Sequence, residues 1–255
     1  MLFFIKLNVF QVAVAIPANN EEARLESALS SVNNAIQFYE SPITKIVVNS
    51  ASTDRTPDIA RDLGFHVIPS ELGIANARNA ALDYAVGQGC KYLLTTDADC
   101  IIPQGWVKTH VQRLNQIDNP AMTIGRVKFH YEKDMNPLTV GQLRAYDAVK
   151  ALMIFLRKKR GIYHATSANM GLNVQEVVDV GGYPKVTGCN EDLDLMNLLI
   201  SKDKLITTVD TTLTTSSRRI LGEGLMRIGL ARFLKIFGII NKAQRDLEKD
   251  YRIIR

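Results

Sequence analysis

Lys91-Tyr-Leu-Leu-Thr-Thr-Asp-Ala-Asp-Cys100 combines an apolar run with two carboxylates. The run ahead of the threonines predicts a short buried strand. Because alternate residues of an extended chain point the same way, Asp97 and Asp99 are expected to face one small volume. Two negative charges at such a short distance repel each other, and a divalent cation held by the hard carboxylate oxygens relieves the repulsion. A solvated turn after a strand is the simpler alternative for an isolated Asp-x-Asp.

Composition describes an ordinary folded chain. Its 255 residues are 46% apolar and 22% charged, enough to bury a large core as one domain, or as one domain with an appendage. Three cysteines at unpaired spacings argue against a disulfide framework and a cysteine-based zinc site, which fits a cytoplasmic location. The sequence has no run of 18 apolar residues, so no membrane-spanning helix is predicted. Residues 1–10 lack the basic start and the cleavage site of a signal peptide, so none is expected there.

The net charge of +5 is concentrated at the end of the chain. Residues 218–255 hold ten Lys or Arg against four Asp or Glu, a net +6, which leaves the first 217 residues at −1. A body so close to neutrality does not predict nucleic-acid binding.

Apolar strand patterns alternate with helical patterns along the first hundred residues. Strands are predicted at 11–16, stopped by Pro17, at 43–49, at 65–68 and in the run before Asp97. Helices are predicted from an asparagine cap at 19–20 to about 37, from a cap within 52–54 to 63, and from 73 to about 87. This alternation predicts an α/β fold with a mainly parallel central sheet and helices on both faces. Ligands bind such sheets at the carboxyl ends of the strands, where Asp97 and Asp99 lie.

The loops after these strands are polar rather than glycine-rich. No Gly-x-Gly-x-x-Gly follows the first strand, and no lysine-bearing phosphate loop exists, so dinucleotide-binding and P-loop folds are excluded. The turn after the first strand leaves backbone N–H groups suited to an anion or a polar ring, although, taken alone, an ordinary connection between strand and helix is the favoured explanation.

The second half of the chain is less regular. A strand is predicted at 122–129, a long helix at 137–155, and a further helix opened by Glu191 and Asp192. Those acids complement the helix dipole or serve catalysis, and both interpretations stay open. The stretch 163–171 is small, polar and not expected in a core.

Six motifs in this order resemble the family 2 glycosyltransferases of the GT-A fold. They are Pro17-Ala18…Asn20-Glu21, Val48-Asn49…Ser52-Thr53-Asp54, Gly73…Arg78-Asn79, Asp97-Ala98-Asp99, Gly181-Gly182-Tyr183 and Glu191-Asp192. The resemblance implies a GT-A catalytic domain over 1–219, with a nucleotide-binding half at about 11–100 and an acceptor-binding half at about 101–219, and then a helical tail over 220–255. It further implies a metal-dependent, inverting transfer of one sugar from a nucleotide diphosphate sugar to a hydroxyl acceptor, with Mn²⁺ or Mg²⁺ as cofactor.

The resemblance also implies roles for individual residues. Residues expected to contact the donor nucleotide are Pro17, Ala18, Asn20, Glu21, Asn49, Asp54, Arg78, Asp97, Ala98 and Arg218. Asp99 would coordinate the metal, Asp97 would contact the ribose or a metal-bound water, and His164 is a further candidate near the metal. Asp192 would be the general base, with Glu191 beside it orienting acceptor or sugar.

These roles agree with the chemistry of the transfer. A departing nucleoside diphosphate develops negative charge, which a bridging cation stabilises. The attacking hydroxyl needs a carboxylate within hydrogen-bond reach to take its proton. Because the family usually has aspartate where this chain has Asn49, which offers both a donor and an acceptor, uracil recognition is not secured. Uridine, guanosine and thymidine diphosphate sugars stay open, with uridine as the first expectation.

The last part of the chain predicts an amphipathic, cationic helix at 222–240. Such a helix packs on the catalytic domain, makes a dimer, or lies on the anionic inner face of a membrane near a lipid-linked acceptor. Glycan, lipid-linked and small-molecule acceptors all stay open, and cell-surface polysaccharide synthesis is one expected setting.

Three other functions are alternatives to the inverting transferase. A retaining GT-A transferase uses similar metal motifs. A sugar-nucleotide pyrophosphorylase needs a glycine-rich basic loop after the first strand, which is missing here. A catalytically silent scaffold protein would be favoured by loss of Asp99 or Asp192, and both are present.

Overall fold

The computed structural model describes residues 11–131, 135–158, 166–184, 191–218 and 221, and backbone alone within 153–158. These residues group into two compact units. The first comprises residues 11–127, 166–184 and 191–213, and the second comprises residues 128–131, 135–158, 214–218 and 221. The predicted tail helix at 222–240 and His164 lie outside the described residues.

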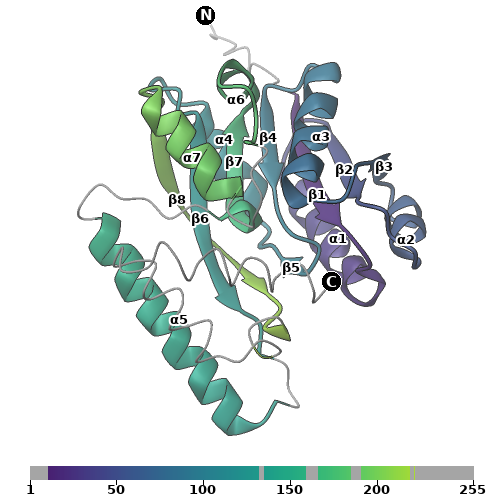
Figure 1. Cartoon of the computed structure of the whole chain (residues 1–255), viewed down its shortest axis with the longest axis vertical. Helices are drawn as coiled ribbons and strands as arrows, with labels where there is room; N and C mark the ends of the chain where they lie inside the picture. Colours follow the sequence, from purple (N-terminus) through teal and green to yellow (C-terminus); the bar gives the residue numbers. More distant parts are fainter. Residues whose placement is uncertain (1–10, 132–134, 159–165, 185–190, 219–220, 222–255) are drawn as a thin grey trace, which may run out of the picture. The chain divides into compact units, whose positions relative to one another are not determined.

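One eight-stranded sheet organises the fold, in the order β3-β2-β1-β4-β7-β6-β8-β5 (Figure 1). Its strands are β1 (Val12–Ala18), β2 (Ile43–Asn49), β3 (His66–Pro69), β4 (Tyr92–Thr95), β5 (Cys100–Ile101), β6 (Met122–Phe129), β7 (Met170–Asn173) and β8 (Ile206–Thr215). Strands β3, β2, β1 and β4 pair in parallel, whereas β7 pairs antiparallel with both β4 and β6. The prediction of a mainly parallel α/β sheet is confirmed, with antiparallel pairing where the second half of the chain joins it.

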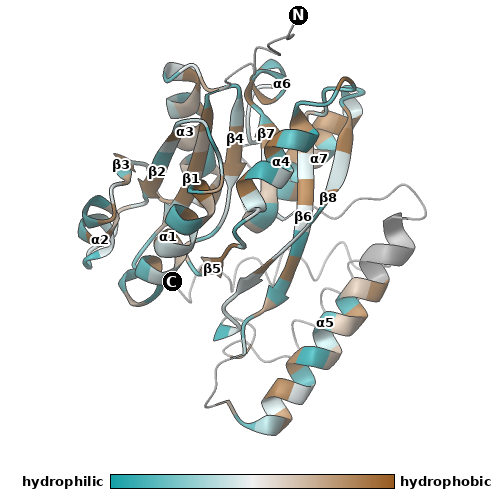
Figure 2. Cartoon of the chain, turned by 180° about the vertical axis from the view of Figure 1, so that it is seen from behind, coloured by the Kyte–Doolittle hydropathy of each residue, from teal (hydrophilic) through white to brown (hydrophobic). Residues whose placement is uncertain are grey.

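Helices cover both faces of the sheet in the first unit. They are α1 (Glu22–Ile36), α2 (Thr56–Asp62), α3 (Ile74–Gly87), α4 (Trp106–Leu114), α6 (Val174–Asp179) and α7 (Glu191–Ser201), with the short 3₁₀ turn η1 (Ser167–Asn169) before β7. Helices α1 and α4 contact each other on one face, and α3 contacts α6 on the other (Figures 1 and 2). Figure 2 shows β1 and β4 as largely hydrophobic strands, which is why both must lie between helical layers.

The sequence predicted that the first strand stops at Pro17, but it does not. It continues to Ala18, where it still pairs with Asn49 of β2. Neighbouring residues of a strand direct their backbone groups to opposite sides. The Ala18 carbonyl accepts from Ser50 on the β2 side, so the missing N–H of Pro17 faces the β4 side. The β4 ladder has already ended there, at the Ala15–Thr95 pair, and no hydrogen bond is lost.

The polar stretch before β7 is buried, contrary to the expectation from its composition. Ser167, Ala168 and Asn169 are at most 5% exposed, and Met170 and Leu172 are fully enclosed. The polar groups tolerate burial because they are hydrogen-bonded: the Thr95 hydroxyl donates to the Ser167 carbonyl at 2.6 Å, and Asn169 bonds to four neighbours.

Gly171 on β7 is a position where a side chain does not fit. A Cβ there would lie 2.6 Å from Thr123 Oγ1 and 2.9 Å from His110 Nδ1, both buried. Gly171→Ala is therefore expected to lower the free energy of unfolding by about 1–3 kcal/mol through overpacking. Urea denaturation measures the change. Gly141→Ala is the matched control, since nothing lies within 4 Å of that Cβ and alanine favours a helix. Equal effects of the two substitutions would contradict the packing argument.

The second unit contains the long helix α5 (Pro137–Lys158), which extends beyond the predicted end at 155. Leu143 and Phe129 are buried together beneath Tyr131, Met135 and Tyr146. Asp147 of α5 links the helix to this cluster, because its Oδ2 accepts from both the Phe129 N–H and the Tyr131 hydroxyl, each at 3.0 Å. In the part of the chain that the structure describes, no helix is long and apolar enough to cross a membrane.

Candidate active site

The carboxyl end of β4 carries Asp97 and Asp99, as predicted. Asp97 Oδ1 accepts from Arg78 Nη2 at 2.6 Å. The Arg78 side chain is only 2% exposed, whereas Asp97 remains 42% exposed. Arg78, predicted to contact the donor, is thus held from inside the protein against Asp97. Its Nε and Nη1 atoms are buried without a hydrogen-bond partner.

The first turn of α7 brings two further carboxylates to this place. Glu191 is 7% exposed, and burial raises its pKa to about 7, an effect that the positive charge of Arg78 partly opposes. Burial also raises the pKa of Asp192, while two backbone N–H groups lower it. Those donors are Ser167, at 3.1 Å from Oδ2, and Leu193, at 2.7 Å from Oδ1.

The electrostatic contributions link the two halves of the site. Asp97 raises the pKa of both Glu191 and Asp192, whereas Arg78 lowers both values. Three carboxyl groups therefore surround one buried guanidinium. Repulsion among the acids favours a bound proton or a cation at this edge of the sheet.

The turn at 181–183 adds a buried aromatic residue to the cluster. Asn79 of α3 holds the turn at both ends, because its Nδ2 donates to the Tyr183 carbonyl and its Oδ1 accepts from the Tyr183 N–H, each at 2.8 Å. Gly182 has a φ of +79°, and a Cβ there would lie 2.7 Å from Asn79 Oδ1, so glycine is required. The Tyr183 hydroxyl is buried without a hydrogen-bond partner.

Burial of Glu191 predicts a pH-dependent stability. Between pH 4.5 and about 7 the folded protein keeps this proton while the unfolded chain loses it, so the residue destabilises the fold increasingly as pH rises through that window. Glu191→Gln carries no charge and is expected to exceed wild type in stability by about 2–3 kcal/mol near pH 7.5, but by little near pH 4.5. Urea denaturation without divalent metal measures this gap. Glu26→Gln, at an exposed position of α1, is the control. A gap that is the same at both pH values would contradict the prediction.

The loops after β1 and β2 bind each other closely. Asn20 N–H donates to Ser52 Oγ at 3.1 Å, and Asn20 Oδ1 accepts from Thr53 N–H at 2.8 Å. Glu21 N–H donates to Thr56 Oγ1 at 2.8 Å. Helix α1 accordingly begins at Glu22, without the predicted asparagine cap. Asn20 instead adopts a left-handed φ of 52° and connects the loops.

The predicted nucleotide residues of the second loop have internal partners. Asp54 accepts from Thr56 N–H at 3.0 Å and from Glu22 N–H at 3.2 Å. Although burial opposes the effect, these donors and the Thr56 hydroxyl hold its pKa below the usual range. Asn49 Oδ1 accepts from Ser52 N–H at 3.1 Å. Both side chains therefore shape the loop, whatever further contact they make.

The remaining predicted residues differ in their surroundings. Pro17 and Ala18 end β1 directly before these loops, and Ala18 and Ala98 are buried, so neither alanine offers a polar side chain. Arg218 is exposed and lies in the second unit.

Carboxylate oxygens at the site could hold a divalent metal. Among the described residues, no three His, Cys, Asp or Glu side chains cluster tightly enough to hold a metal ion by themselves. Mg²⁺ and similar ions are usually held by one or two carboxylates together with substrate phosphates. Asp97 and Asp99 fit that arrangement, with Asp97 already committing one oxygen to Arg78.

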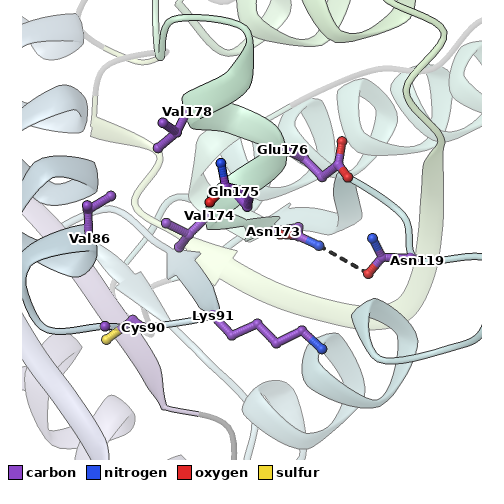
Figure 3. Close-up of a pocket in the computed structure, with 10 residues that line it drawn as sticks. Val86, Cys90, Lys91, Asn119, Asn173, Val174, Gln175, Glu176 and Val178 are labelled. Atoms are coloured by element: carbon purple, nitrogen blue, oxygen red, sulfur yellow. Dashed lines mark hydrogen bonds between the residues drawn. The ribbon is translucent and has the colours of Figure 1, made fainter.

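A separate hollow lies at the opposite edge of the sheet (Figure 3). It has a volume of about 620 Å³ and is lined by residues before β4, at the end of β7 and in α6, including Lys91, Asn173 and Val174. Asn173 Nδ2 donates to Asn119 Oδ1 at 3.1 Å across it. Because Lys91 and Asp97 flank β4 at its two ends, this hollow is distinct from the carboxylate cluster.

Several residues of the cluster were missed by sequence reasoning. Ser167 contributes only its backbone N–H, which leaves no signal in a side-chain pattern. Asn169 and His110 are fully buried, and each is an isolated polar residue among apolar or small neighbours. Asn79 and Tyr183 do stand in the quoted motifs, but without a role.

The profile of the family described as Glycosyl transferase family 2 matches residues 13–174. No curated protein matches the chain. Among solved structures, the chain is similar to the mannosyltransferase PcManGT from Pyrobaculum calidifontis in complex with GDP-Man and Mn²⁺, at 21% identity and a TM-score of 0.56, over 79% of this chain and 56% of that one. It is also similar to residues 1–349 of S. aureus TarS, at 18% identity and a TM-score of 0.58, over 88% of this chain and 66% of that one.

A third similar structure is glucosyl-3-phosphoglycerate synthase from Mycobacterium tuberculosis, in complex with Mn²⁺, UDP and glucosyl-3-phosphoglycerate. It shares 19% identity and gives a TM-score of 0.56, over 91% of this chain and 82% of that one. At these identities the likeness establishes the fold. The chain spans 56% and 66% of the lengths of the first two structures.

Proposed function

The chain belongs to glycosyl transferase family 2, and we propose that it transfers one sugar from a nucleotide diphosphate sugar to a hydroxyl acceptor, inverting the anomeric carbon, with Asp192 as general base. The observation that carries this proposal is the meeting of two carboxylate groups from distant parts of the chain. Asp97 follows β4, Glu191 and Asp192 lie in the first turn of α7, and the charge of Asp97 raises the pKa of both Glu191 and Asp192.

Asp192 has the properties of a proton acceptor. Burial makes its carboxylate more basic than in water, while the N–H groups of Ser167 and Leu193 keep it oriented. In the proposed step the acceptor oxygen bonds to the anomeric carbon, the bond from that carbon to the diphosphate oxygen breaks, and the hydroxyl proton passes to Asp192. Glu191, whose pKa is about 7, is partly protonated at neutral pH and can donate a hydrogen bond to acceptor or sugar.

The donor side is proposed to lie along the loops after β1, β2 and β4. Pairing between Asn20, Ser52 and Thr53 holds the first two loops in a fixed arrangement, which limits the entropy lost on binding a nucleotide. Asp99 and Asp97 would hold Mn²⁺ or Mg²⁺ together with the diphosphate. When bound, such a cation neutralises negative charge on the leaving group.

The mannosyltransferase and the synthase described above hold Mn²⁺ with GDP-Man or UDP, which supports a nucleotide diphosphate and a metal here as well. A UDP-sugar is the first donor to test, with GDP- and dTDP-sugars as alternatives because of Asn49. The acceptor is proposed to be a hydroxyl of a glycan, a lipid-linked glycan or a small molecule. Contact of the segment 222–240 with the inner face of a membrane would suit a lipid-linked acceptor.

Calorimetric titration of UDP, GDP and dTDP, each with and without MnCl₂, tests the donor site. One nucleotide is expected to bind only with the metal present, which would also identify the base. Absence of binding for all three in MnCl₂ would overturn the donor site and favour a silent scaffold protein. Inversion is tested separately, by the anomeric coupling constant of the sugar product. An anomer identical to that of the donor would establish retention and remove the need for Asp192 as a base.

A further inference from the structure

Asn169 of η1 is the centre of a buried hydrogen-bond network. Its Oδ1 accepts from Trp106 Nε1 at 2.8 Å and from His110 Nε2 at 2.9 Å. Its Nδ2 donates to the carbonyl oxygens of Arg126 at 2.7 Å and Thr211 at 3.4 Å. The side chain is fully enclosed. One amide therefore ties the turn before β7 to α4, β6 and β8.

The direction of every bond in this network is determined. An indole nitrogen only donates, so the atom facing Trp106 must be the amide oxygen. His110 must then donate from Nε2. Burial lowers the pKa of His110 to about 4, so the ring is neutral and its Nδ1 accepts from the Thr123 hydroxyl at 2.7 Å. A buried network with all partners satisfied holds its members in one arrangement.

Strand β6 leaves room for the side-chain amide of Asn169. A Cβ at Gly125 of β6 would lie 2.3 Å from Asn169 Nδ2, so any larger residue would push the amide out of place. Glycine at 125 has a φ that other residues adopt, and its requirement here is therefore steric. The close approach of the Asn169 amide to the Gly125 backbone indicates that this amide occupies one specific position.

The same turn reaches the proposed base. Asn169 N–H donates to the Thr166 carbonyl at 3.0 Å, which closes the turn, and the Thr95 hydroxyl donates to the Ser167 carbonyl at 2.6 Å. Ser167 N–H is then directed at Asp192 Oδ2, at 3.1 Å. We propose that Asn169 is a positioning residue of the transferase: it anchors η1 so that the Ser167 N–H orients the Asp192 carboxylate. The role of Asp192 as base rests on the function proposed above.

Loss of this anchor has a defined consequence for Asp192. Among the described residues, the charged and titratable groups that act on it are Glu191, Arg78, Asp97 and Tyr183, and none of these four is hydrogen-bonded to the Asn169 side chain. Removing the amide is therefore expected to act on Asp192 through Ser167. Without that N–H the carboxylate is less well oriented, and its pKa rises.

The test compares Asn169→Ala with Asn173→Ala. Asn173 is a buried asparagine on the adjoining strand β7, and its amide bonds to Asn119 at the opposite end of β4 from Asp97. Both substitutions remove a buried amide and are expected to lower the melting temperature. Only Asn169→Ala is expected to slow nucleotide release from UDP-glucose or GDP-mannose in MnCl₂, with water as acceptor, by about 10- to 100-fold in kcat. Its acidic pH–rate limb should move to higher pH, and binding of the nucleotide should stay within about threefold of wild type.

The double variant Asn169→Ala/Asp192→Asn separates positioning from general damage. If Asn169 acts through Asp192, the double variant is no slower than Asp192→Asn alone, because residues acting as a unit are not additive. Multiplicative losses in the double variant, or equal kcat losses in the Asn169→Ala and Asn173→Ala variants, would overturn the proposal.

A readout without turnover keeps this inference distinct from the proposed function. In ¹⁵N-labelled wild type and Asn173→Ala, the Ser167 amide resonance is expected to shift as Asp192 titrates. In Asn169→Ala that dependence should be lost. A Ser167 resonance that still follows Asp192 in Asn169→Ala overturns the anchoring. The transferase proposal is tested separately, by the nucleotide titrations and the product anomer described above. If wild type releases no nucleotide from UDP-glucose or GDP-mannose, the amide titration still decides whether Asn169 positions Asp192.

Discussion

Asp192→Asn is expected to lower sugar transfer by at least about 100-fold while leaving metal-dependent nucleotide binding near its wild-type value. The amide cannot take a proton from the acceptor hydroxyl. It also cannot accept on both sides, because Oδ1 and Oδ2 of Asp192 face the N–H groups of Leu193 and Ser167. In the asparagine variant, one of these two N–H groups would face the NH₂ of the amide, which is also a donor, and would lose its hydrogen bond. The loss should therefore fall on kcat, with no comparable effect on donor affinity.

Asp194→Asn is the matched control for this prediction. It removes one negative charge from the same first turn of α7 and keeps the aspartate at 192. Nucleotide binding by calorimetry and initial rates at saturating donor should be measured for both variants. Turnover of Asp192→Asn within about threefold of wild type would show that the base lies elsewhere. Parallel losses in both variants would point to the charge of the helix start rather than to proton transfer.

The alternating strands and helices of the first hundred residues could be predicted because their signals are local. Strands β2 and β6 have the predicted bounds of 43–49 and 122–129, since each is an apolar run between turn residues. The position of Asp97 and Asp99 follows from the same logic: in an α/β sheet, the residues after a buried strand lie at its carboxyl edge.

Helix starts and strand ends were predicted less well because they depend on distant residues. The asparagines at 19–20 were expected to cap α1, but the side-chain oxygen Oδ1 of Asn20 accepts from the Thr53 N–H, 33 residues away. The backbone of Glu22 is capped instead by Asp54, 32 residues away. A local pattern cannot distinguish a cap of its own helix from a link to the next loop.

The composition of 163–171 predicted an exposed segment, but residues 167–171 are buried. Small polar residues usually lie at the surface, and the sequence contains no sign that Asn169 meets Trp106, 63 positions away. Arg78 shows the same limitation at the site. Its motif predicted a donor contact, which stays a prediction, but gave no sign that Arg78 is hydrogen-bonded to Asp97 and almost entirely buried. The types of residue at the site were predictable, but the pairs they form were not.

The two carboxylates after β4 are expected to respond differently to substitution. Asp97 neutralises the buried guanidinium of Arg78, so Asp97→Ala leaves a buried charge without its partner. Breaking a pair of this kind from one side is expected to destabilise the fold by about 2–4 kcal/mol. Asp99→Ala keeps the Arg78–Asp97 ion pair, so it does not leave the buried guanidinium without this partner. Its principal effect should be on the metal, with metal-dependent nucleotide affinity reduced more than about 100-fold because a direct carboxylate ligand is lost.

Urea denaturation and calorimetric titration of UDP, GDP and dTDP with MnCl₂ should be carried out on the same preparations of both variants. Asp58→Ala is the control, since it removes an exposed carboxylate from α2 and breaks only a surface pair with Arg61. It should change stability by less than about 1 kcal/mol and leave nucleotide binding intact. Unchanged metal-dependent binding in Asp99→Ala would remove that residue from the metal site. If Asp97→Ala proved as stable as wild type, Arg78 would have to find its counter-charge in Glu191 or Asp192, the other two acids that interact with it.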